Sequence, residues 1–153
     1  MDYERCVYIT IGLLGSGKST WAKRFAKNRP NVKIVCPDSF RTMLNGEYKY
    51  LAELDDVITQ STYDTAFNLL WAGYDVIVDC GNLTNAPDRR KKWLELPARH
   101  IAVVFPVRDR DWHIGNRGKD PHCEADWGAI WDRERAAYEP VNNADYDEVA
   151  LIN

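Results

Sequence analysis

The sequence contains no apolar run that approaches the ~20 residues needed to cross a bilayer, so we expect no membrane-spanning helix and no membrane partner. Its four cysteines are widely spaced and include no C-x-x-C pair, which argues against a zinc site and indicates reduced thiols in a cytoplasmic protein. Its three histidines form neither a metal pattern nor a triad, so we interpret them as structural. The N-terminal residues lack the form of a signal peptide. Without internal repeats or linkers, residues 1–153 are expected to form one domain.

The charge of the chain is small, with a formal net value of −3 at pH 7. This value does not indicate a general nucleic-acid coat protein, but local basic patches matter more for a nucleic-acid enzyme than the total does. One basic run covers residues 89–92, and we interpret it as the solvated outer face of a helix rather than as a strand-binding patch. A second group of basic residues lies between residues 108 and 119.

The most specific motif is the phosphate-binding pattern G-x-x-x-x-G-K-[ST], which residues 12–19 match at every fixed position. Residues 7–11 before it predict a buried strand, and residues 20–28 after it predict a helix. Glycines let the backbone curl around phosphate oxygens, and the helix N-terminus adds partial positive charge. Lys18 is expected to reach the β- and γ-phosphates, and Ser19 to bind Mg²⁺. The motif therefore predicts a nucleoside triphosphate site formed by Gly12, Leu13, Gly15, Ser16, Gly17, Lys18, Ser19 and Thr20.

Strands and helices alternate along the chain. Further strands are expected at residues 32–36, 74–78, 100–105 and 148–152, and further helices at residues 38–44, 53–72, 87–94 and 124–138. Nearly continuous apolar strands between helices indicate a parallel sheet that is covered on both faces. We therefore predict an α/β fold, with a P-loop kinase-like parallel sheet of four to five strands and helices on both faces. Ligands of such sheets bind at the carboxyl ends of the strands.

The residues that follow the predicted strands resemble those of a known family. The chain is similar to the kinase domain of the phage-type polynucleotide 5′-hydroxyl kinase family, which belongs to the P-loop NTPase superfamily. The similarity extends from Val7 to about Pro121 and lies in an ordered set of motifs: residues 12–25, 37–41, 79–83, 88–90 and 117–118. The family often has threonine where this chain has Gly81. The segment of about residues 107–121 would correspond to the lid of the family.

The resemblance implies roles for two residues after the second strand. Asp38 would be the general base that accepts the proton of an acceptor hydroxyl, which an ordinary ionised carboxylate can do in a loose phosphoryl-transfer transition state. Arg41 would hold a phosphate of the acceptor nucleotide by a charge-assisted contact. The alternatives are a helix cap for Asp38 and a surface position for Arg41.

Three further residues receive roles from the same resemblance. Asp79 ends an apolar strand, as a Walker-B-type carboxylate does, and would reach Mg²⁺ through water or position the acceptor. Asn82 would orient Asp79 or contact the acceptor; a turn role is the alternative for both. Arg117 would be the lid arginine that covers the β- and γ-phosphates, unless it is a solvated side chain. Arg108 or Arg110 are candidates for a second lid arginine.

These expectations favour an enzyme that uses ATP and Mg²⁺ to phosphorylate the 5′-hydroxyl end of DNA or RNA. The catalytic residues would be Lys18, Asp38, Arg41 and Arg117. Two other functions fit parts of the pattern. A kinase that acts on a nucleoside, a small metabolite or a hydroxymethylated base in DNA would use the same phosphate loop and Asp38. A non-catalytic nucleotide-binding switch would need only the loop.

Overall fold

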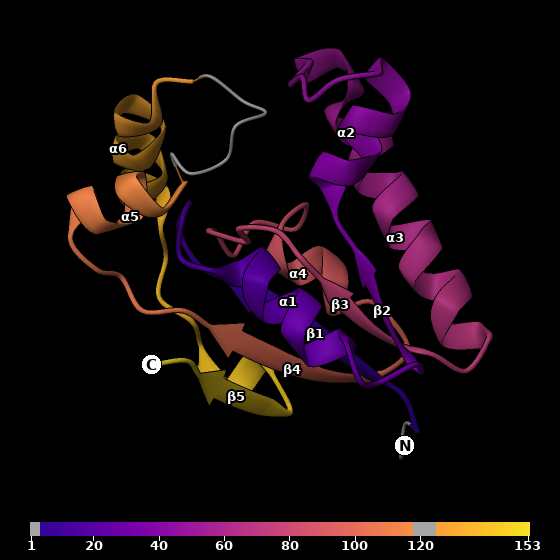
Figure 1. Ribbon diagram of the computed structural model, residues 1–153. Coiled ribbons are helices and arrows are strands. Elements are labelled where there is room, and N and C mark those ends of the chain that lie inside the picture. The colour runs from indigo at the N-terminus through magenta and orange to yellow at the C-terminus, as the bar shows by residue number, and fades with distance from the viewer. Residues whose placement is uncertain (1–3, 118–124) are drawn as a thin grey trace.

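A five-stranded parallel sheet forms the centre of the protein in the computed structural model, which describes residues 4–117 and 125–153 (Figure 1). The strand order is β2-β3-β1-β4-β5, and all four neighbouring pairs are parallel. This arrangement confirms the predicted fold class. The strands are β1 (Cys6–Ile11), β2 (Val32–Val35), β3 (Asp75–Val78), β4 (Arg99–Val104) and β5 (Glu148–Leu151).

The helices occupy the segments between the strands. They are α1 (Lys18–Ala26), α2 (Pro37–Asn45), α3 (Asp55–Trp71), α4 (Arg90–Trp93), α5 (Arg110–Arg117) and α6 (Trp127–Ala137), with short 3₁₀ turns at Ala52–Leu54 and Asn143–Asp145. The sequence analysis expected a longer helix where α4 is, and it did not predict α5. The sequence of α5 contains Gly115 and several charged residues, and His113 is its buried residue. The segment therefore lacks the repeated apolar positions from which a helix is predicted.

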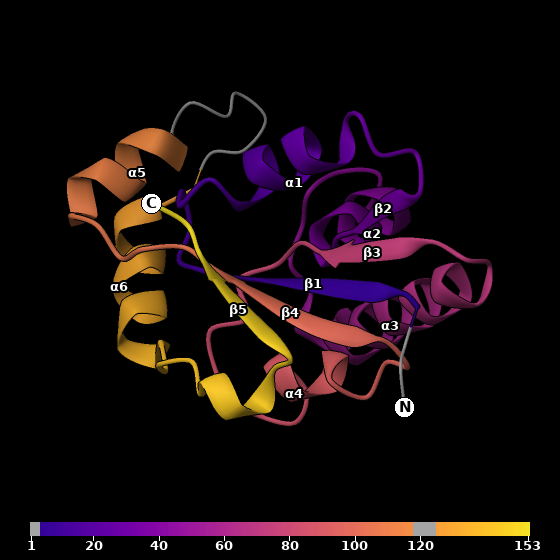
Figure 2. The same ribbon diagram turned by 90° about the horizontal axis from the view of Figure 1, so that it is seen from below.

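The two faces of the sheet bury alternate residues of the strands. Val7, Ile9 and Ile11 on β1 pack with buried residues of α3 and α4, whereas Tyr8 packs on the other face with Trp21 and Phe25 of α1. Figure 2 shows α1 on one side of the sheet and α3 and α4 on the other. Each fully buried Val or Ile contributes roughly 1.5–3 kcal/mol by leaving water. This packing fixes the strands, and it therefore fixes the positions of the loops at their carboxyl ends.

Two groups of helices rise beyond the carboxyl ends of the strands. In Figure 1, α2 and the start of α3 lie on the side of β2, whereas α5 and α6 lie on the side of β4. The phosphate loop at the end of β1 lies between these groups because β1 is the middle strand. In the described ranges, 4–117 and 125–153, no helix has the length and hydrophobicity that a membrane crossing requires.

Candidate active site

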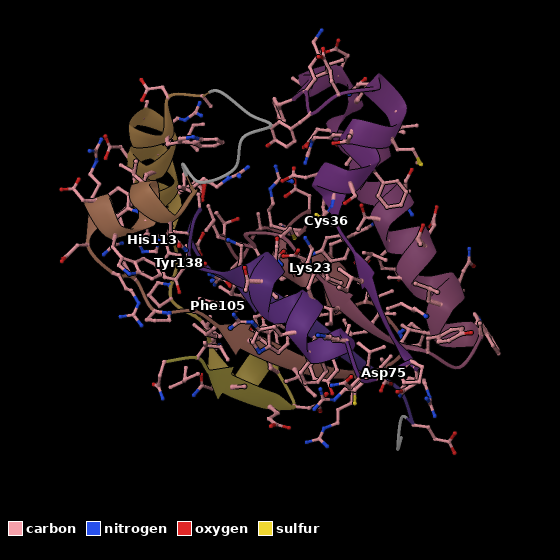
Figure 3. All side chains as sticks on the ribbon, viewed as in Figure 1. Lys23, Cys36, Asp75, Phe105, His113 and Tyr138 are labelled. Atoms are coloured by element: carbon pink, nitrogen blue, oxygen red, sulfur yellow. The ribbon has the colours of Figure 1, made fainter. Side chains whose placement is uncertain are left out.

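A cavity of about 1220 Å³ opens at the carboxyl ends of the strands. It is lined by the phosphate loop, by α2 and the start of α3, by the loop after β3, and by α5 and α6. Figure 3 shows His113 on the α5 side and Cys36, at the end of β2, on the α2 side. The cavity is lined by the predicted residues Gly15, Gly17, Lys18, Ser19, Thr20, Asp38, Arg41, Asp79, Asn82 and Arg117. The predicted residues Gly12, Leu13 and Ser16 are not among those that line it.

The phosphate loop has the backbone conformation that its glycines permit. Gly15 and Gly17 have φ angles of 67° and 94°, which residues with a Cβ rarely adopt. Gly17 directly precedes α1, so the positive end of the helix dipole points into the loop. Gly12 donates its N–H to the carbonyl of Gly81 at 3.0 Å, which joins the loop to the chain after β3. The predicted strand–loop–helix geometry is therefore present.

Lys18 lies across this loop. Its amine donates to the carbonyl of Leu13 at 2.8 Å and to the hydroxyl of Ser16 at 3.4 Å. Burial lowers the pKa of Lys18, and the nearby carboxylates of Glu134 and Asp79 oppose that shift. A partly buried ammonium in a loop of this shape is suited to bind phosphate oxygens.

Ser19 and Asp79 meet at the first turn of α1. The Ser19 hydroxyl donates to a carboxylate oxygen of Asp79 at 2.8 Å, and Asp79 is only 6% exposed. Burial raises the pKa of Asp79, although the Ser19 bond and the Lys18 charge act in the opposite direction. A hydroxyl next to a carboxylate is an oxygen donor set that Mg²⁺ prefers, and such sites are completed by water and phosphate. These two residues therefore fit the Mg²⁺ site that the sequence predicts.

Asp38 and Arg41 lie one turn apart on α2, which begins at Pro37. Arg41 donates to Asp38 at 2.7 Å and to Asp55, at the start of α3, at 3.0 Å. The Asp38 side chain is 53% exposed, whereas that of Arg41 is 14% exposed. Asp38 therefore presents a solvent-accessible carboxylate to the cavity, and two carboxylates fix the guanidinium group beside it.

Asn82 is more deeply buried than Asp38 and Arg41. It is 5% exposed, and its φ angle is 51° in the turn after β3. Its amide nitrogen donates to the carbonyl of Thr10 at 2.8 Å, and its amide oxygen accepts from the indole N–H of Trp93 at 2.6 Å. Both ends of the amide are thus used within the protein, which supports a positioning role at the strand ends more than the expected acceptor contact.

The helices α5 and α6, which we call the α5–α6 arm, hold the phosphate loop by direct bonds to its backbone. His113 Nδ1 contacts the carbonyl of Leu14 at 2.9 Å, and Asn116 donates to the carbonyl of Gly15 at 2.7 Å. Glu134 accepts the N–H of Leu14 at 3.0 Å. No local pattern in the sequence indicates these contacts, because they join residues about 100 positions apart or more.

Burial shifts the pKa values of His113 and Glu134, the two titratable groups of the arm that contact the loop backbone. The pKa of His113 is lowered, so the ring is neutral near pH 7. Since the N–H of Arg108 donates to His113 Nε2 at 3.0 Å, Nδ1 carries the proton and donates to Leu14. Burial raises the pKa of Glu134, and the Lys18 charge opposes that shift.

Arg117 ends α5 and lines the cavity, with its guanidinium 4.4 Å from the centre of the Trp127 ring. Arg110 instead pairs with Asp132 at 2.9 Å, and Arg108 lies over the ring of Trp112. Among these three arginines, Arg117 is therefore placed best for the predicted lid role. Residues 118–121 of the predicted lid lie outside the described residues.

The predicted solvated helix face at residues 89–92 is wrong for Arg90. Its side chain is 1% exposed and lies over the ring of Tyr138. It donates to the backbone carbonyls of Asn82, Leu83, Glu139 and Pro140 and to the side chain of Asn85. Arg90 thus joins the loop after β3 to the chain after α6, and the N–H of Glu139, which donates to the carbonyl of Leu83 at 2.8 Å, joins the same two segments.

These features define a P-loop kinase-like nucleotide site on an α/β fold. The family model described as an AAA domain (AAA_33) matches residues 7–141. The chain therefore belongs to this family.

Solved structures with the same fold include kinases of several kinds. One is a chain of the Pnkp1/Rnl/Hen1 RNA repair complex, with 24% identity, a TM-score of 0.74 and coverage of 90% of this chain and 44% of that one. A sugar kinase from Janibacter sp. HTCC2649 has 20% identity and a TM-score of 0.68, and the match covers 97% and 84% of the two chains. Shikimate kinase from Acinetobacter baumannii has 14% identity, a TM-score of 0.56 and the same coverage. This chain spans less than half of the RNA-repair chain, and likeness at these identities establishes the fold.

Proposed function

We propose that the protein transfers the γ-phosphate of ATP to the 5′-hydroxyl end of a polynucleotide, either DNA or RNA. The observation that supports this proposal most strongly is the Asp38–Arg41 pair. The pair lines the same cavity as the phosphate loop, so a base and an anion-binding group face the nucleotide site together. Free Cys6, Cys36 and Cys80 are compatible with a reducing, cytoplasmic setting.

The nucleotide side of the reaction uses the phosphate loop and α5. Lys18 and the loop N–H groups bind the phosphates of ATP, and Arg117 neutralises charge that develops on the transferred group. Ser19 and Asp79 hold Mg²⁺, which supplies further neutralisation of phosphate charge. Asn82 positions the strand ends through Thr10 and Trp93.

The acceptor side uses α2. Asp38 accepts the proton of the attacking hydroxyl, and its exposure lets the acceptor approach it. Arg41 exchanges its bond to Asp38 for a bond to an acceptor phosphate, while its second bond to Asp55 keeps the guanidinium in place. The exchange leaves the Asp38 carboxylate available to the hydroxyl.

A second function has support from the comparisons. A sugar kinase and shikimate kinase share the fold over 97% of this chain and 84% of their own lengths, so a small hydroxyl-bearing substrate fits the same architecture. Arg41 distinguishes a polynucleotide from neutral acceptors, because a neutral sugar or a free nucleoside has no phosphate for the guanidinium to bind.

An acceptor panel tests the proposal. Radiolabelled ATP is incubated with the protein, Mg²⁺ and one acceptor: 5′-hydroxyl DNA, 5′-hydroxyl RNA, DNA with hydroxymethylated bases, nucleosides or sugars. We expect label on polynucleotide 5′ ends, and we expect Arg41→Ala to raise the acceptor KM while Arg24→Ala, on the exposed side of α1, does not. Label on nucleosides or sugars alone would contradict the polynucleotide substrate. Tight ATP binding without any labelled product would favour a nucleotide-binding switch.

A further inference from the structure

A row of alternating charges crosses the α2 side of the cavity. Asp38 pairs with Arg41 at 2.7 Å, Arg41 with Asp55 at 3.0 Å, and Asp55 with Arg89 at 3.4 Å. The row joins three separate segments: α2, the first turn of α3 and the chain just before α4. We call this row the α2 wall. All four residues line the cavity that contains the phosphate loop.

The two arginines of this wall are held differently. Arg41 makes two short ion pairs and is 14% exposed. Arg89 is 43% exposed, and its contacts to Asp55 and Asp88 measure 3.4 and 3.5 Å. Strong charge-assisted hydrogen bonds of this kind measure about 2.7–2.9 Å. Arg89 is therefore held loosely, and it can exchange these contacts for a phosphate more easily than Arg41 can.

Asp55 keeps the two guanidinium groups beside one another. One of its carboxylate oxygens accepts from Arg41, and the other accepts from Arg89. Two cationic groups side by side on one wall match a ligand with regularly spaced negative charges. A polynucleotide has such charges, with one phosphate per nucleotide. A sugar or a nucleoside has none.

We infer that Arg89 binds the second phosphate of the acceptor strand, next to the first phosphate bound by Arg41, and that Asp55 positions both arginines. The inference rests on the proposed function and makes it more specific: the preferred acceptor has at least two phosphates beyond its 5′-hydroxyl. Arg89 is then a specificity-determining residue. Asp55 is a positioning residue because it acts through the two guanidinium groups.

Steady-state kinetics with two acceptors test the inference. One acceptor is a nucleoside 3′-monophosphate with a single phosphate, and the other is a 5′-hydroxyl octanucleotide, both with the sugar that the wild-type enzyme phosphorylates. We expect Arg89→Ala to raise the KM of the octanucleotide about tenfold and to leave the KM of the monophosphate within about twofold. Lys91→Ala is the matched control, because Lys91 is exposed and lies outside the cavity. It should change neither value.

The salt dependence of acceptor binding is a second measurement, and it should not change if Arg89 has only a structural role. A lost phosphate contact to a single strand lowers the slope of log affinity against log salt by about 0.7. We expect that decrease in Arg89→Ala for the octanucleotide, whereas Arg89→Lys should keep the slope because the charge remains. Asp55→Asn should raise the KM of both acceptors without changing the Kd of ATP, since Arg41 loses its anchor as well.

The outcomes separate this inference from the proposed function. If wild-type protein labels no polynucleotide, the proposed function itself is wrong. If wild-type protein labels the octanucleotide and Arg89→Ala behaves as Lys91→Ala does, only the role of Arg89 is wrong. An equal rise of KM for both acceptors in Arg89→Ala would also overturn the inference, because it would place Arg89 on the first phosphate.

Discussion

The two sides of the cavity are held by different forces. In the α5–α6 arm, His113 and Asn116 donate hydrogen bonds to carbonyls of the phosphate loop, and Glu134 accepts the N–H of Leu14. Burial shifts the pKa values of His113 and Glu134. The α2 wall is held by ion pairs between side chains that are 14–53% exposed. Exposed ion pairs contribute little to stability and weaken with salt, whereas breaking a buried hydrogen bond, such as the one from His113 to Leu14, leaves a buried group unpaired.

We therefore expect substitutions on the two sides of the cavity to change different properties of the protein. Changes in the arm should affect folding stability and nucleotide binding, because the arm shares its bonds with the loop that binds phosphate. Changes in the α2 wall should affect use of the acceptor and leave stability nearly unchanged. The variants below test that division.

The largest effect on stability is expected from Arg90→Met. The substitution keeps the apolar stem but leaves the backbone carbonyls of Asn82, Glu139 and Pro140 without the guanidinium donor. The carbonyl of Leu83 keeps the N–H of Glu139 as a donor. We expect a loss of about 3–5 kcal/mol, and we expect about 0.5 kcal/mol or less for the exposed neighbour Lys91→Met. Urea unfolding measures both. Equal midpoints for the two variants would show that Arg90 does not hold the chain after α6.

The next largest effects on stability are expected from alanine substitutions at two glycines. A Cβ at Gly15 would overlap the carbonyl oxygen of His113, whereas a Cβ at Gly46, at the end of α2, would meet nothing within 4 Å. Their φ angles are similar, at 67° and 76°, so alanine is strained at both by about 1–2 kcal/mol. Gly15→Ala should therefore cost about 3 kcal/mol and Gly46→Ala about 1 kcal/mol in thermal unfolding. An equal loss of stability in the two variants would show that the His113 carbonyl does not exclude a Cβ at position 15.

Glu134→Gln should strengthen ATP binding. Glutamine still accepts the N–H of Leu14, but it removes a negative charge that lies near Lys18 and repels phosphate. We expect the Kd of ATP to fall about fivefold, which is about 1 kcal/mol. Asp132→Asn makes the same charge change on the exposed side of α6 and is the control.

The advantage of Glu134→Gln should also depend on pH. Burial raises the pKa of Glu134, so the wild-type carboxyl is protonated at acid pH and becomes charged as pH rises through that raised pKa. The difference in ATP affinity between the two proteins should therefore grow with pH, as calorimetry can measure. A constant difference would contradict the role of this charge.

The smallest effect is the pH dependence contributed by His113. Its pKa is lowered in the folded protein, so the unfolded chain binds a proton more readily. Stability must then rise with pH between the lowered pKa and the ordinary value of about 6.5, and must fall as pH drops through that window. His113→Asn should lack this slope when urea unfolding is compared at pH 5, 6 and 8. An unchanged slope would mean that protonation does not break the bond from Arg108.

The parts of this molecule that sequence predicted well depend on local patterns. The phosphate loop, the five strands, α1 and α3 each follow from the spacing of neighbouring residues or from short motifs. The sequence also indicated that the residues after parallel strands meet at one edge of the sheet, and the structure shows Asp79 beside Ser19 at that edge.

The features that sequence did not predict depend on contacts between distant segments. Glu134 reaches Leu14 across 120 positions, and Asp55 reaches Arg89 across 34. Arg90 was expected in solvent because it stands within a basic run, but its burial depends on carbonyls from residues 139 and 140. Such contacts can be identified only once the order of the strands in the sheet is known.

The central claim is that Asp38 is the base for transfer from ATP bound in the phosphate loop. Single-turnover transfer from radiolabelled ATP to a 5′-hydroxyl oligonucleotide tests it most directly, with wild-type protein, Asp38→Asn and the exposed control Asp56→Asn. The account predicts that Asp38→Asn loses about 100-fold or more in rate while its Kd for ATP matches that of the wild type. Transfer by Asp38→Asn at the wild-type rate would contradict it.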